Sequence, residues 1–407
     1  MKKEHNSLHN LGILIATSFL GGMRFNMVRA VWQPFVLSLG ASMPVLGFLE
    51  GLAGRRGLIT AIIQPLSGWF SDRQGRKPFV AVANLMAIIS LVFCIFADQI
   101  GTWWPLLPAT IALGLIGISK PARDSMTAES VERKALGTAY SAVMMAFIVP
   151  GIFAPVIGGF IAEKWGFTPL FIIGIALECV ALVLVLRFLQ ETLNNSSAVK
   201  VPSPNPSVHL AEFRTLWRDI FKRTMIPPSD LKGFYIATAV DAFVWGLGAG
   251  ILYGMLHKTY GFSLAQLGLM SSVLSGVWAI SQMPIGKLVD TLGAKVFLIA
   301  SEVLGIAVVV GWITSTSFRA FLILQVGWAL VAATWVPAML TFLAHRVPSD
   351  ERAEAMGKMA AFRGIFSFPA PYIGGLLYDL WGIRGPLEAN LIGVIVALML
   401  IIALVRE

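Results

Sequence analysis

Long apolar stretches alternate with short polar connections along almost the whole chain. Each stretch is close to the roughly 20 residues that an α-helix needs to cross a bilayer. Twelve can be delimited: 11–38, 43–70, 78–97, 105–122, 137–160, 168–188, 231–256, 264–285, 296–314, 319–343, 355–378 and 385–405. The pattern therefore predicts an all-α polytopic membrane protein with twelve transmembrane helices.

A polar interval, residues 189–230, separates the first six stretches from the last six. It is rich in Asn, Ser and Pro, a composition typical of a flexible linker. Within it, residues 212–225 place apolar side chains on one helical face and basic ones on the other. This predicts an amphipathic helix on the cytoplasmic membrane surface. We therefore divide the chain into an N-terminal six-helix bundle (1–188), a linker (189–230) and a C-terminal six-helix bundle (231–407).

The second group of stretches repeats features of the first. The hexapeptide APVIGG at 154–159 returns as APYIGG at 370–375. A Gly-x-x-x-Asp pattern with a following glycine also occurs twice, as Gly68, Asp72 and Gly75 and as Gly286, Asp290 and Gly293. Two homologous halves are typical of secondary transporters, in which one half rocks against the other around a central site.

Composition excludes a water-soluble globule and a single-pass anchor. Of the 407 residues, 57% are apolar and only 13% are charged, whereas a soluble domain has about a quarter of its residues charged. The net charge of +9 comes from basic residues between apolar runs, so nucleic-acid binding is not expected. Cys94 and Cys179 lie in apolar stretches and form no disulfide or metal-binding pattern.

The basic residues orient the chain in the membrane. Most of the 31 Lys and Arg residues fall on the side that holds both termini, and the opposite side holds Lys164, Lys258, Arg319 and Arg384. Because cytoplasmic loops carry the excess of Lys and Arg, both termini are expected in the cytoplasm. The expected location is the cell membrane.

The connection after the second stretch carries a family motif. It reads GWFSDRQGRKP at 68–78 and resembles the GxxxDRxGRKP signature of the major facilitator superfamily, and the likeness extends over all twelve helices. The resemblance implies two pseudo-symmetric six-helix bundles around a central cavity. It also implies that this loop latches the halves in the outward-facing state.

The motif and the charges near it predict a cytoplasmic gate. In it, Arg123, Asp124, Glu129 and Arg133 would pair with Asp72 and Arg76, and Arg363 would close the cluster from the other half. The full predicted gate consists of Gly68, Asp72, Arg73, Gly75, Arg76, Arg123, Asp124, Glu129, Asp290 and Arg363.

The repeated hexapeptide resembles the tail of the GxxxGPxxGG antiporter motif of proton-coupled drug exporters. Pro150 and Ala154 stand where that motif has glycines, and residues 109–117 lack the arginine that those exporters carry in the middle of helix 4. We expect hinges in helices 5 and 11 at Pro155, Gly158, Gly159, Pro371, Gly374 and Gly375.

Nine ionisable residues lie inside the apolar stretches. Each costs at least about 2.5–3.5 kcal/mol at mid-membrane unless it finds a partner or a cavity. They are Arg24, Arg29, Glu50, Arg55, Arg56, Glu178, Asp241, Glu302 and Arg363. The surplus of positive charge lies in the first two stretches, and of the nine residues Arg24, Arg29, Glu50, Arg55, Arg56 and Asp241 are the candidates for substrate and proton binding.

On the first helix, Ser18, Gly22, Asn26, Arg29 and Gln33 share one face, which is expected to line the cavity. Arg24 lies about 140° away around the helix, so it either reaches the cavity from the side or pairs with a neighbouring helix. Glu50 is expected to pair with Arg29, either as a switch that breaks when substrate or proton binds or as a static link. Arg55 and Arg56 diverge, so at most one faces the cavity squarely.

In the second half, Asp241 is the candidate proton carrier, because an isolated carboxylate at mid-membrane is suited to that task. A structural pair with Arg24 or with a partner on helix 11 is the alternative. Glu178 and Glu302 are expected at peripheral positions, in packing, lipid-facing or interfacial roles. The remaining candidate cavity residues are Trp245, Trp278, Gln282, Gln325, Trp328 and Trp335.

The sequence lacks a GxxxxGK[ST] loop and the HExxH and GxSxG motifs, so neither ATP-driven transport nor enzymatic activity is expected. No cofactor or metal is expected. The expected partners are a small-molecule substrate, protons and membrane lipids, and the protein is expected to be a monomer. The favoured function is proton-coupled export of amphiphilic or drug-like molecules by alternating access. One alternative is transport of an organic anion or phosphorylated solute by the arginines of helices 1 and 2, and another is a non-transporting sensor or lipid-handling protein.

Overall fold

The computed structural model describes residues 2–53, 57–132, 135–193, 226–348 and 352–405. Every regular element in these ranges is a helix. The predicted amphipathic helix at 212–225 lies outside the described residues, as do Arg55, Arg56 and Arg133.

The elements fall into two groups. The N-terminal group consists of α1 (Lys2–Ser38), α2 (Met43–Ala53), α3 (Leu58–Gln74), α4 (Lys77–Ile100), α5 (Leu106–Leu115), η1 (Ile116–Ile118), α6 (Ser119–Glu129), α7 (Leu136–Ile148), η3 (Val149–Ile152), α8 (Ala154–Trp165) and α9 (Phe167–Phe188). The C-terminal group consists of α11 (Lys232–Gly248), η4 (Ala249–Ile251), α12 (Leu252–Tyr260), α13 (Leu264–Leu292), α14 (Ala294–Thr314), α15 (Phe318–Arg346), α16 (Arg352–Ser367), α17 (Ala370–Trp381) and α18 (Arg384–Leu404).

In chain order these described elements form twelve segments, which agree with the predicted stretches, and the all-α fold is confirmed. Eight of the segments are long and apolar enough to cross a membrane as continuous or nearly continuous helices within the described residues. The other four segments are divided, namely α2 with α3, α5 with α6, α7 with α8, and α16 with α17. Hydropathy did not predict these breaks, because an interrupted helix stays apolar throughout.

Proline accounts for the breaks in the fifth and eleventh segments. Pro155 lies in the first turn of α8 and Pro371 in the first turn of α17, where a missing N–H costs nothing but the preceding helix cannot continue. The α7–η3 segment and α8 meet at 40°. The two bends occupy equivalent places in the repeat.

Two pairs of glycines show the repeat in the backbone. Gly75 ends α3 with φ of 95°, and Gly293 ends α13 with φ of 91°. Gly166 after α8 and Gly382 after α17 also have positive φ, of 86° and 64°. These conformations favour glycine because a Cβ would clash there.

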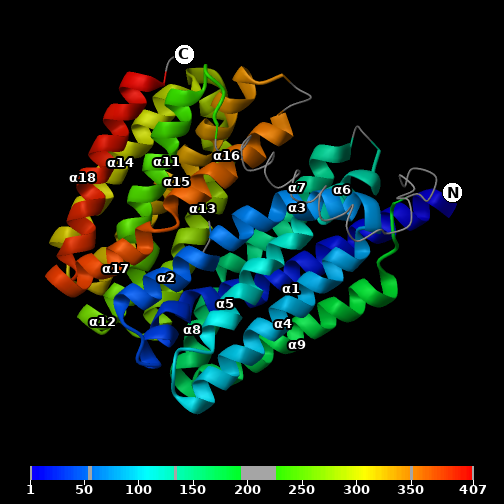
Figure 1. Ribbon diagram of the computed structural model, residues 1–407, viewed down its shortest axis with the longest axis horizontal. Helices are drawn as coiled ribbons and strands as arrows, with labels where there is room; N and C mark the ends of the chain where they lie inside the picture. The colour runs from blue at the N-terminus through cyan, green and yellow to red at the C-terminus, as the bar shows by residue number, and fades with distance from the viewer. Residues whose placement is uncertain (1, 54–56, 133–134, 194–225, 349–351, 406–407) are drawn as a thin grey trace, which may run out of the picture.

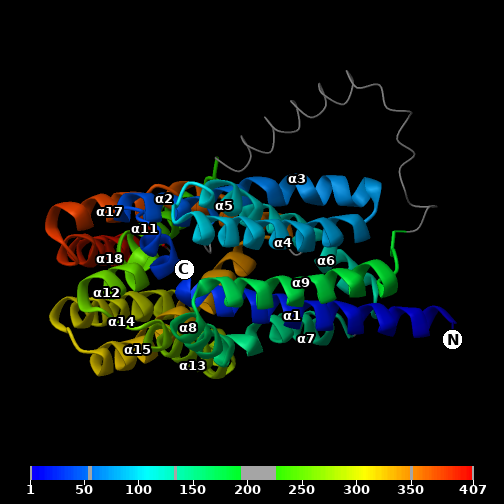
Figure 2. The same ribbon diagram turned by 90° about the horizontal axis from the view of Figure 1, so that it is seen from below.

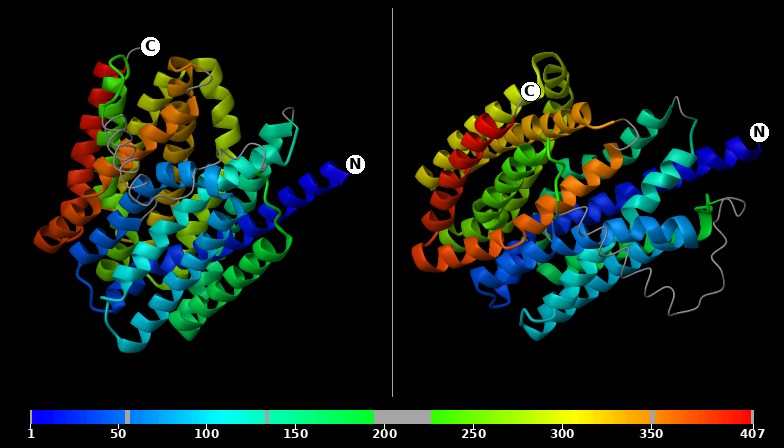
Figure 3. Two further views of the ribbon diagram at one scale, coloured as in Figure 1. Left: turned by 45° about the vertical axis from the view of Figure 1, so that its right-hand side comes forward. Right: turned by 45° about the horizontal axis from the view of Figure 1, so that its top comes forward.

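The two groups meet at the end of the molecule opposite the termini, which we call the far end. There α2, α8, α12 and α17 lie together, and the helices of the two groups diverge toward the end that holds the termini (Figures 1 and 3). Figure 2 shows the N-terminal group with α3 and α4 on one side and α1 and α9 on the other. The largest apolar core contains residues of both groups, among them Phe35 and Met255.

Four glycines let the groups approach closely at the far end. A Cβ at Gly47 of α2 would overlap the carbonyl oxygen of Pro371, and one at Gly375 of α17 would overlap that of Met43. In the other repeat pair, Gly268 of α13 faces the carbonyl of Pro155, and Gly159 of α8 faces that of Leu264. We call Gly47, Gly159, Gly268 and Gly375 the glycine seam. Small residues of this kind allow backbones to touch where two membrane helices cross.

Gly158 and Gly374 approach backbone within their own groups. A Cβ at Gly158 would overlap the carbonyl of Met27, and one at Gly374 would overlap that of Leu247. Each therefore holds its bent helix against the first helix of its half.

The outer surface is apolar along the long helices. Exposed side chains include Val92 on α4, Val183 on α9, Ile323 on α15 and Met399 on α18, each more than half exposed. A surface of this composition suits contact with lipid tails and not with water.

Candidate functional site

Arg29 of α1 and Glu50 of α2 form an ion pair between the first two segments. The Nη1 atom of Arg29 lies 2.6 Å from Oε1 of Glu50. The Glu50 side chain is 3% exposed, whereas that of Arg29 is 32% exposed and so can still be reached. The pair expected from the sequence is confirmed, and its role in transport stays a prediction.

Gln33 joins this pair to the other half of the molecule. Its Nε2 atom donates to Oε1 of Glu50 (2.9 Å) and to the carbonyl oxygen of Gly250 (2.8 Å). Its Oε1 atom accepts from the backbone N–H of Gly254, also at 2.8 Å. Gly250 and Gly254 are four residues apart and would bond to each other in an α-helix, but η4 interrupts the helix there. One side-chain amide thus completes an interrupted turn of the opposite half.

Arg24 pairs with Glu178 of α9, at 2.8 Å between Nε and Oε1, and both side chains are buried. Arg24 therefore takes the second of its two predicted options, a neighbouring helix. The expectation that Glu178 is lipid-facing or interfacial is wrong, because it is 2% exposed. Sequence reasoning missed this pair because Arg24 and Glu178 are far apart in the chain and only the bundle brings them together.

Arg123 of α6 lies beside this pair and points into the N-terminal group. It donates to the hydroxyls of Thr17 and Ser18 at 3.1 and 3.4 Å and to Oδ1 of Asn84 at 3.5 Å. All three partners are neutral. The Arg123 side chain was expected to pair with the gate residues, but it forms hydrogen bonds to α1 and α4 instead.

Asp241 of α11 is not isolated. Its Oδ2 atom accepts from Nη2 of Arg363 on α16 at 2.6 Å, and both side chains are buried. Nε of Arg363 also donates to the carbonyl of Thr238, at 3.0 Å. Asp241 therefore pairs with a residue of helix 11, which is one of the two partners predicted for it. Because Arg363 is bound in this pair, the expectation that it joins the gate is wrong.

Glu302 of α14 lies at the same cluster. It is 1% exposed, and the charged groups that act on it are Asp241 and Arg363. Of the packing, lipid-facing and interfacial roles expected for Glu302, the lipid-facing and interfacial ones are therefore wrong. Asp241, Glu302 and Arg363 come from the seventh, ninth and eleventh segments, respectively. Hydropathy along a single stretch cannot show that these three segments become neighbours.

The gate motif has a partly different arrangement from the one expected. Arg76 does form an ion pair with Glu129, and Gly68 packs on Pro121 at ordinary contact distance. Asp124 pairs with Lys120 on its own helix, at 2.9 Å. The Asp72 side chain lies outside the described residues, Arg73 is half-buried, and Asp290 is exposed at the end of α13.

Glu191, which follows α9, anchors the motif loop. Its carboxylate accepts backbone N–H groups from Arg76 and Lys77, at 2.9 and 3.0 Å, and from Thr192 and Leu193, at 3.0 and 3.1 Å. A Cβ at Gly75 would lie 2.8 Å from Oε2 of Glu191, so glycine is needed there. Partial burial raises the pKa of Glu191, but the four N–H groups outweigh it, and the pKa lies below its ordinary value.

The predicted cavity aromatics are mostly packed inside the C-terminal group. The Trp245 ring stacks on Trp328, with centroids 6.4 Å apart, and meets the edge of Trp312. Trp335 is 5% exposed, and its ring lies beneath the guanidinium of Arg363. The remaining predicted residues are Gln325, fully buried, and Gln282 and Trp278, half-buried. In the N-terminal group, Asn26 donates to the carbonyl of Gly22 on its own helix, at 2.8 Å.

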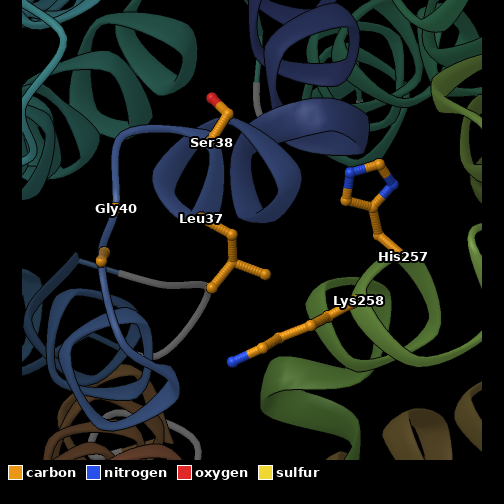
Figure 4. Close-up of a pocket in the computed structure, with 6 residues that line it drawn as sticks. Leu37, Ser38, Gly40, His257 and Lys258 are labelled. Atoms are coloured by element: carbon orange, nitrogen blue, oxygen red, sulfur yellow. The ribbon is translucent and has the colours of Figure 1, made fainter.

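One pocket opens at the far end, between the two halves. It has a volume of about 340 Å³ and is lined by Leu37, Ser38, Gly40, Ala41, His257 and Lys258 (Figure 4). None of the predicted site residues lines it. No three His, Cys, Asp or Glu side chains in the described ranges come together as a metal site.

Comparisons with known proteins identify relatives over nearly the full length. A family model described as "Major Facilitator Superfamily" matches residues 14–254 and again 234–407. The multidrug resistance protein MdtG of Rahnella sp. (strain Y9602) is 24% identical over 93% of this chain and 89% of its own length. MdtG of Proteus mirabilis (strain HI4320) is 25% identical over 94% of this chain and 93% of its own.

Solved structures with the same fold come from several transporter types. The human organic anion transporter MFSD10 (TETRAN) has a TM-score of 0.66 and 15% identity, covering 97% of this chain and 99% of that one. A D-xylose-proton symporter has a TM-score of 0.69 and 16% identity, covering 99% and 98%. A POT family transporter bound to a thioalcohol-conjugated peptide reaches 0.74 at 14% identity, covering 97% and 95%. At these identities the likeness establishes the fold alone.

Proposed function

Because this chain belongs to the major facilitator superfamily, whose members are secondary transporters, we propose that it exports amphiphilic or drug-like small molecules in exchange for protons, by alternating access. The observation that carries the proposal is the Arg29–Glu50–Gln33 network. It joins the buried carboxylate of Glu50 to a contact between the two halves. Protonation of Glu50 can therefore change how readily the two halves separate. The full-length likeness to MdtG multidrug resistance proteins supports the substrate class.

In this proposal the structure represents the state that opens toward the termini. The glycine seam closes the far end, and the helices diverge at the other end (Figure 3). With both termini in the cytoplasm, as the basic residues indicate, this is the inward-facing state. Substrate would enter from the cytoplasm or the inner leaflet.

A proton on Glu50 would release the far end. The neutral carboxyl no longer attracts Arg29, and it is a weaker acceptor for Nε2 of Gln33. Gln33 would then be held only by Gly250 and Gly254 of the opposite half, which lowers the free energy needed to separate the halves. Protonation from outside would thus coincide with opening to the outside, as exchange of substrate for protons requires.

The test is transport of ethidium, an amphiphilic cation, in proteoliposomes with an imposed pH gradient. We expect ethidium to accumulate in vesicles with an acidic lumen and to stop when nigericin collapses the gradient. Accumulation that is equal with and without the gradient would contradict proton coupling. The control is empty liposomes under the same gradient.

A second function, transport of an organic anion, is favoured by the arginines. Arg29 is reachable, and the hydrogen bonds of Arg123 go to neutral groups, so either guanidinium could bind a carboxylate or phosphate. A thermal-shift screen separates the two functions. Stabilisation of the purified protein by lipophilic cations alone would oppose the anion transporter, and stabilisation by organic anions alone would oppose the drug exporter. A ligand that binds but is never transported would indicate the sensor or lipid-handling alternative.

A further inference from the structure

We propose that Asp241 and Glu302 form a carboxyl pair that holds one exchangeable proton between them, so that Glu302 is a second proton-binding residue of the C-terminal half. The proposal rests on the proposed proton coupling, and it names where one of the protons is carried.

The surroundings of Glu302 favour a protonated carboxyl. Its side chain is 1% exposed, and neither of its carboxyl oxygens meets an N–H or O–H donor of the described residues. The charged group that acts on it most strongly is instead the carboxyl of Asp241. Two ionised carboxylates can only accept, so a hydrogen bond between them exists only when one carries a proton.

The charge balance of the cluster also favours one proton on the pair. Arg363 is the cation at this cluster, and its Nη2 atom is committed to Asp241 at 2.6 Å. With both carboxyls ionised the buried cluster would carry one net negative charge, which is costly at membrane depth. One proton on the pair makes the cluster neutral.

The neighbouring helices supply no other compensating charge. α15 contributes Trp335 and Met339, which contact the Arg363 guanidinium. The other charged residues whose side chains are described on α11, α14, α15, α16 and α18, and on α3, α13 and α17 that pack against them, are exposed or half-buried toward the helix ends: Arg73, Lys232, Lys287, Asp290, Lys295, Arg319, His345, Arg346, Arg352, Glu354, Lys358, Asp379, Arg384 and Glu388. A proton on the pair is therefore what neutralises the remaining negative charge of the cluster.

The position of Arg363 links the pair to the motion of the halves. Arg363 lies on α16, one turn before the break that leads into α17, and α16 also packs against α3 of the opposite group. Rocking of the halves can therefore move Arg363 relative to Asp241 and Glu302. While Arg363 is close, one proton on the pair makes the cluster neutral. If Arg363 withdraws, the pair keeps one negative charge unless it takes up a further proton, which it releases again when Arg363 returns.

The test is the size of the ethidium gradient that a pH gradient supports. At equilibrium each exchanged proton allows about tenfold accumulation per pH unit. We expect Glu302→Gln to lose about tenfold of accumulation per pH unit, which corresponds to one proton fewer, while exchange of ethidium without a gradient continues. The matched control is Glu388→Gln, because Glu388 is exposed on α18. Accumulation by Glu302→Gln at the wild-type level would overturn the inference.

A measurement on the wild-type protein needs no variant. The infrared spectrum of the purified protein at neutral pH should contain the C=O stretch of a protonated carboxyl, and substrate or high pH should remove it. Absence of that band in a wild-type protein that does exchange protons for ethidium would contradict the shared proton. Failure of the proposed function is a different result, in which wild-type protein does not respond to a pH gradient at all.

Discussion

At the scale of single residues, buried charges in this protein are arranged as partners on different helices. Arg24 has Glu178, Arg29 has Glu50, and Asp241 has Arg363. Such pairs repay the cost of taking charge into the bilayer only when both members are present. The pairs differ in access, because the Arg24–Glu178 pair is buried whereas Arg29 is partly exposed. We therefore expect the first pair to matter for stability and the second for transport.

Glu178→Gln should destabilise the protein by about 3–5 kcal/mol, because it leaves the Arg24 guanidinium buried without its carboxylate. Arg24→Met combined with Glu178→Leu should recover most of that loss. Denaturant unfolding of the purified variants in detergent is the measurement. If the double variant is as unstable as the single one, an uncompensated charge is not the cause.

Glu50→Gln should behave differently. It removes the charge that holds Arg29 but keeps an acceptor for Gln33, so the protein should fold and still exchange ethidium. We expect its ethidium accumulation to fall by about tenfold per pH unit, which corresponds to the one proton that Glu50 carries. Accumulation at the wild-type level in Glu50→Gln would mean that the Arg29–Glu50 pair is a static link between α1 and α2.

At the scale of elements, the start of α4 depends on a residue from another helix. The N-cap residue of α4 is Arg76, and its side chain does not cap the helix. Glu191 fills that role from beyond the end of α9. A carboxylate at a helix N-terminus also interacts favourably with the helix dipole.

This arrangement makes the contribution of Glu191 to stability dependent on pH. Its pKa is lowered in the folded protein, so the contribution is present above the unfolded pKa of about 4.3 and is lost as the pH falls through the folded value. Glu191→Gln should cost about 1 kcal/mol at neutral pH, as loss of a helix cap does. Thermal unfolding of both proteins between about pH 7 and pH 3 should give curves that converge in acid. Curves that stay parallel would oppose this role.

At the scale of the whole molecule, the glycine seam sets how closely the halves approach. An added side chain at Gly268 would overlap the backbone at Pro155, which lies across the interface. The closed far end would then be strained, while a state that is open there would not be. The seam should therefore control the balance between the two states.

Gly268→Val should shift the molecule toward a state that is open at the far end. Spin labels on cysteines replacing Trp104 and Trp381, exposed residues of opposite halves, should report a longer distance in a background with Cys179→Ser. Gly286→Val on the same helix is the matched control, because a Cβ there meets no atom within 4 Å. An unchanged distance for Gly268→Val would contradict the expected role of the seam.

The sequence by itself determined the number and limits of the membrane segments, the repeat and the family. Those properties depend on local hydropathy and on short motifs, and the positive-φ glycines Gly75 and Gly293 mark the same turn in both halves. Helical spacing was also sufficient to predict the Arg29–Glu50 pair, because the two residues lie on consecutive helices.

Only the tertiary structure decided the partners that come from distant segments. Arg24 with Glu178, Arg363 with Asp241, and Glu302 beside them depend on which helices become neighbours in the bundle and on how each is rotated about its axis. Hydropathy places a residue at a depth in the membrane but does not specify that rotation. For the same reason Gln33, which the sequence marked as a cavity residue, was found to bridge the interrupted turn between Gly250 and Gly254.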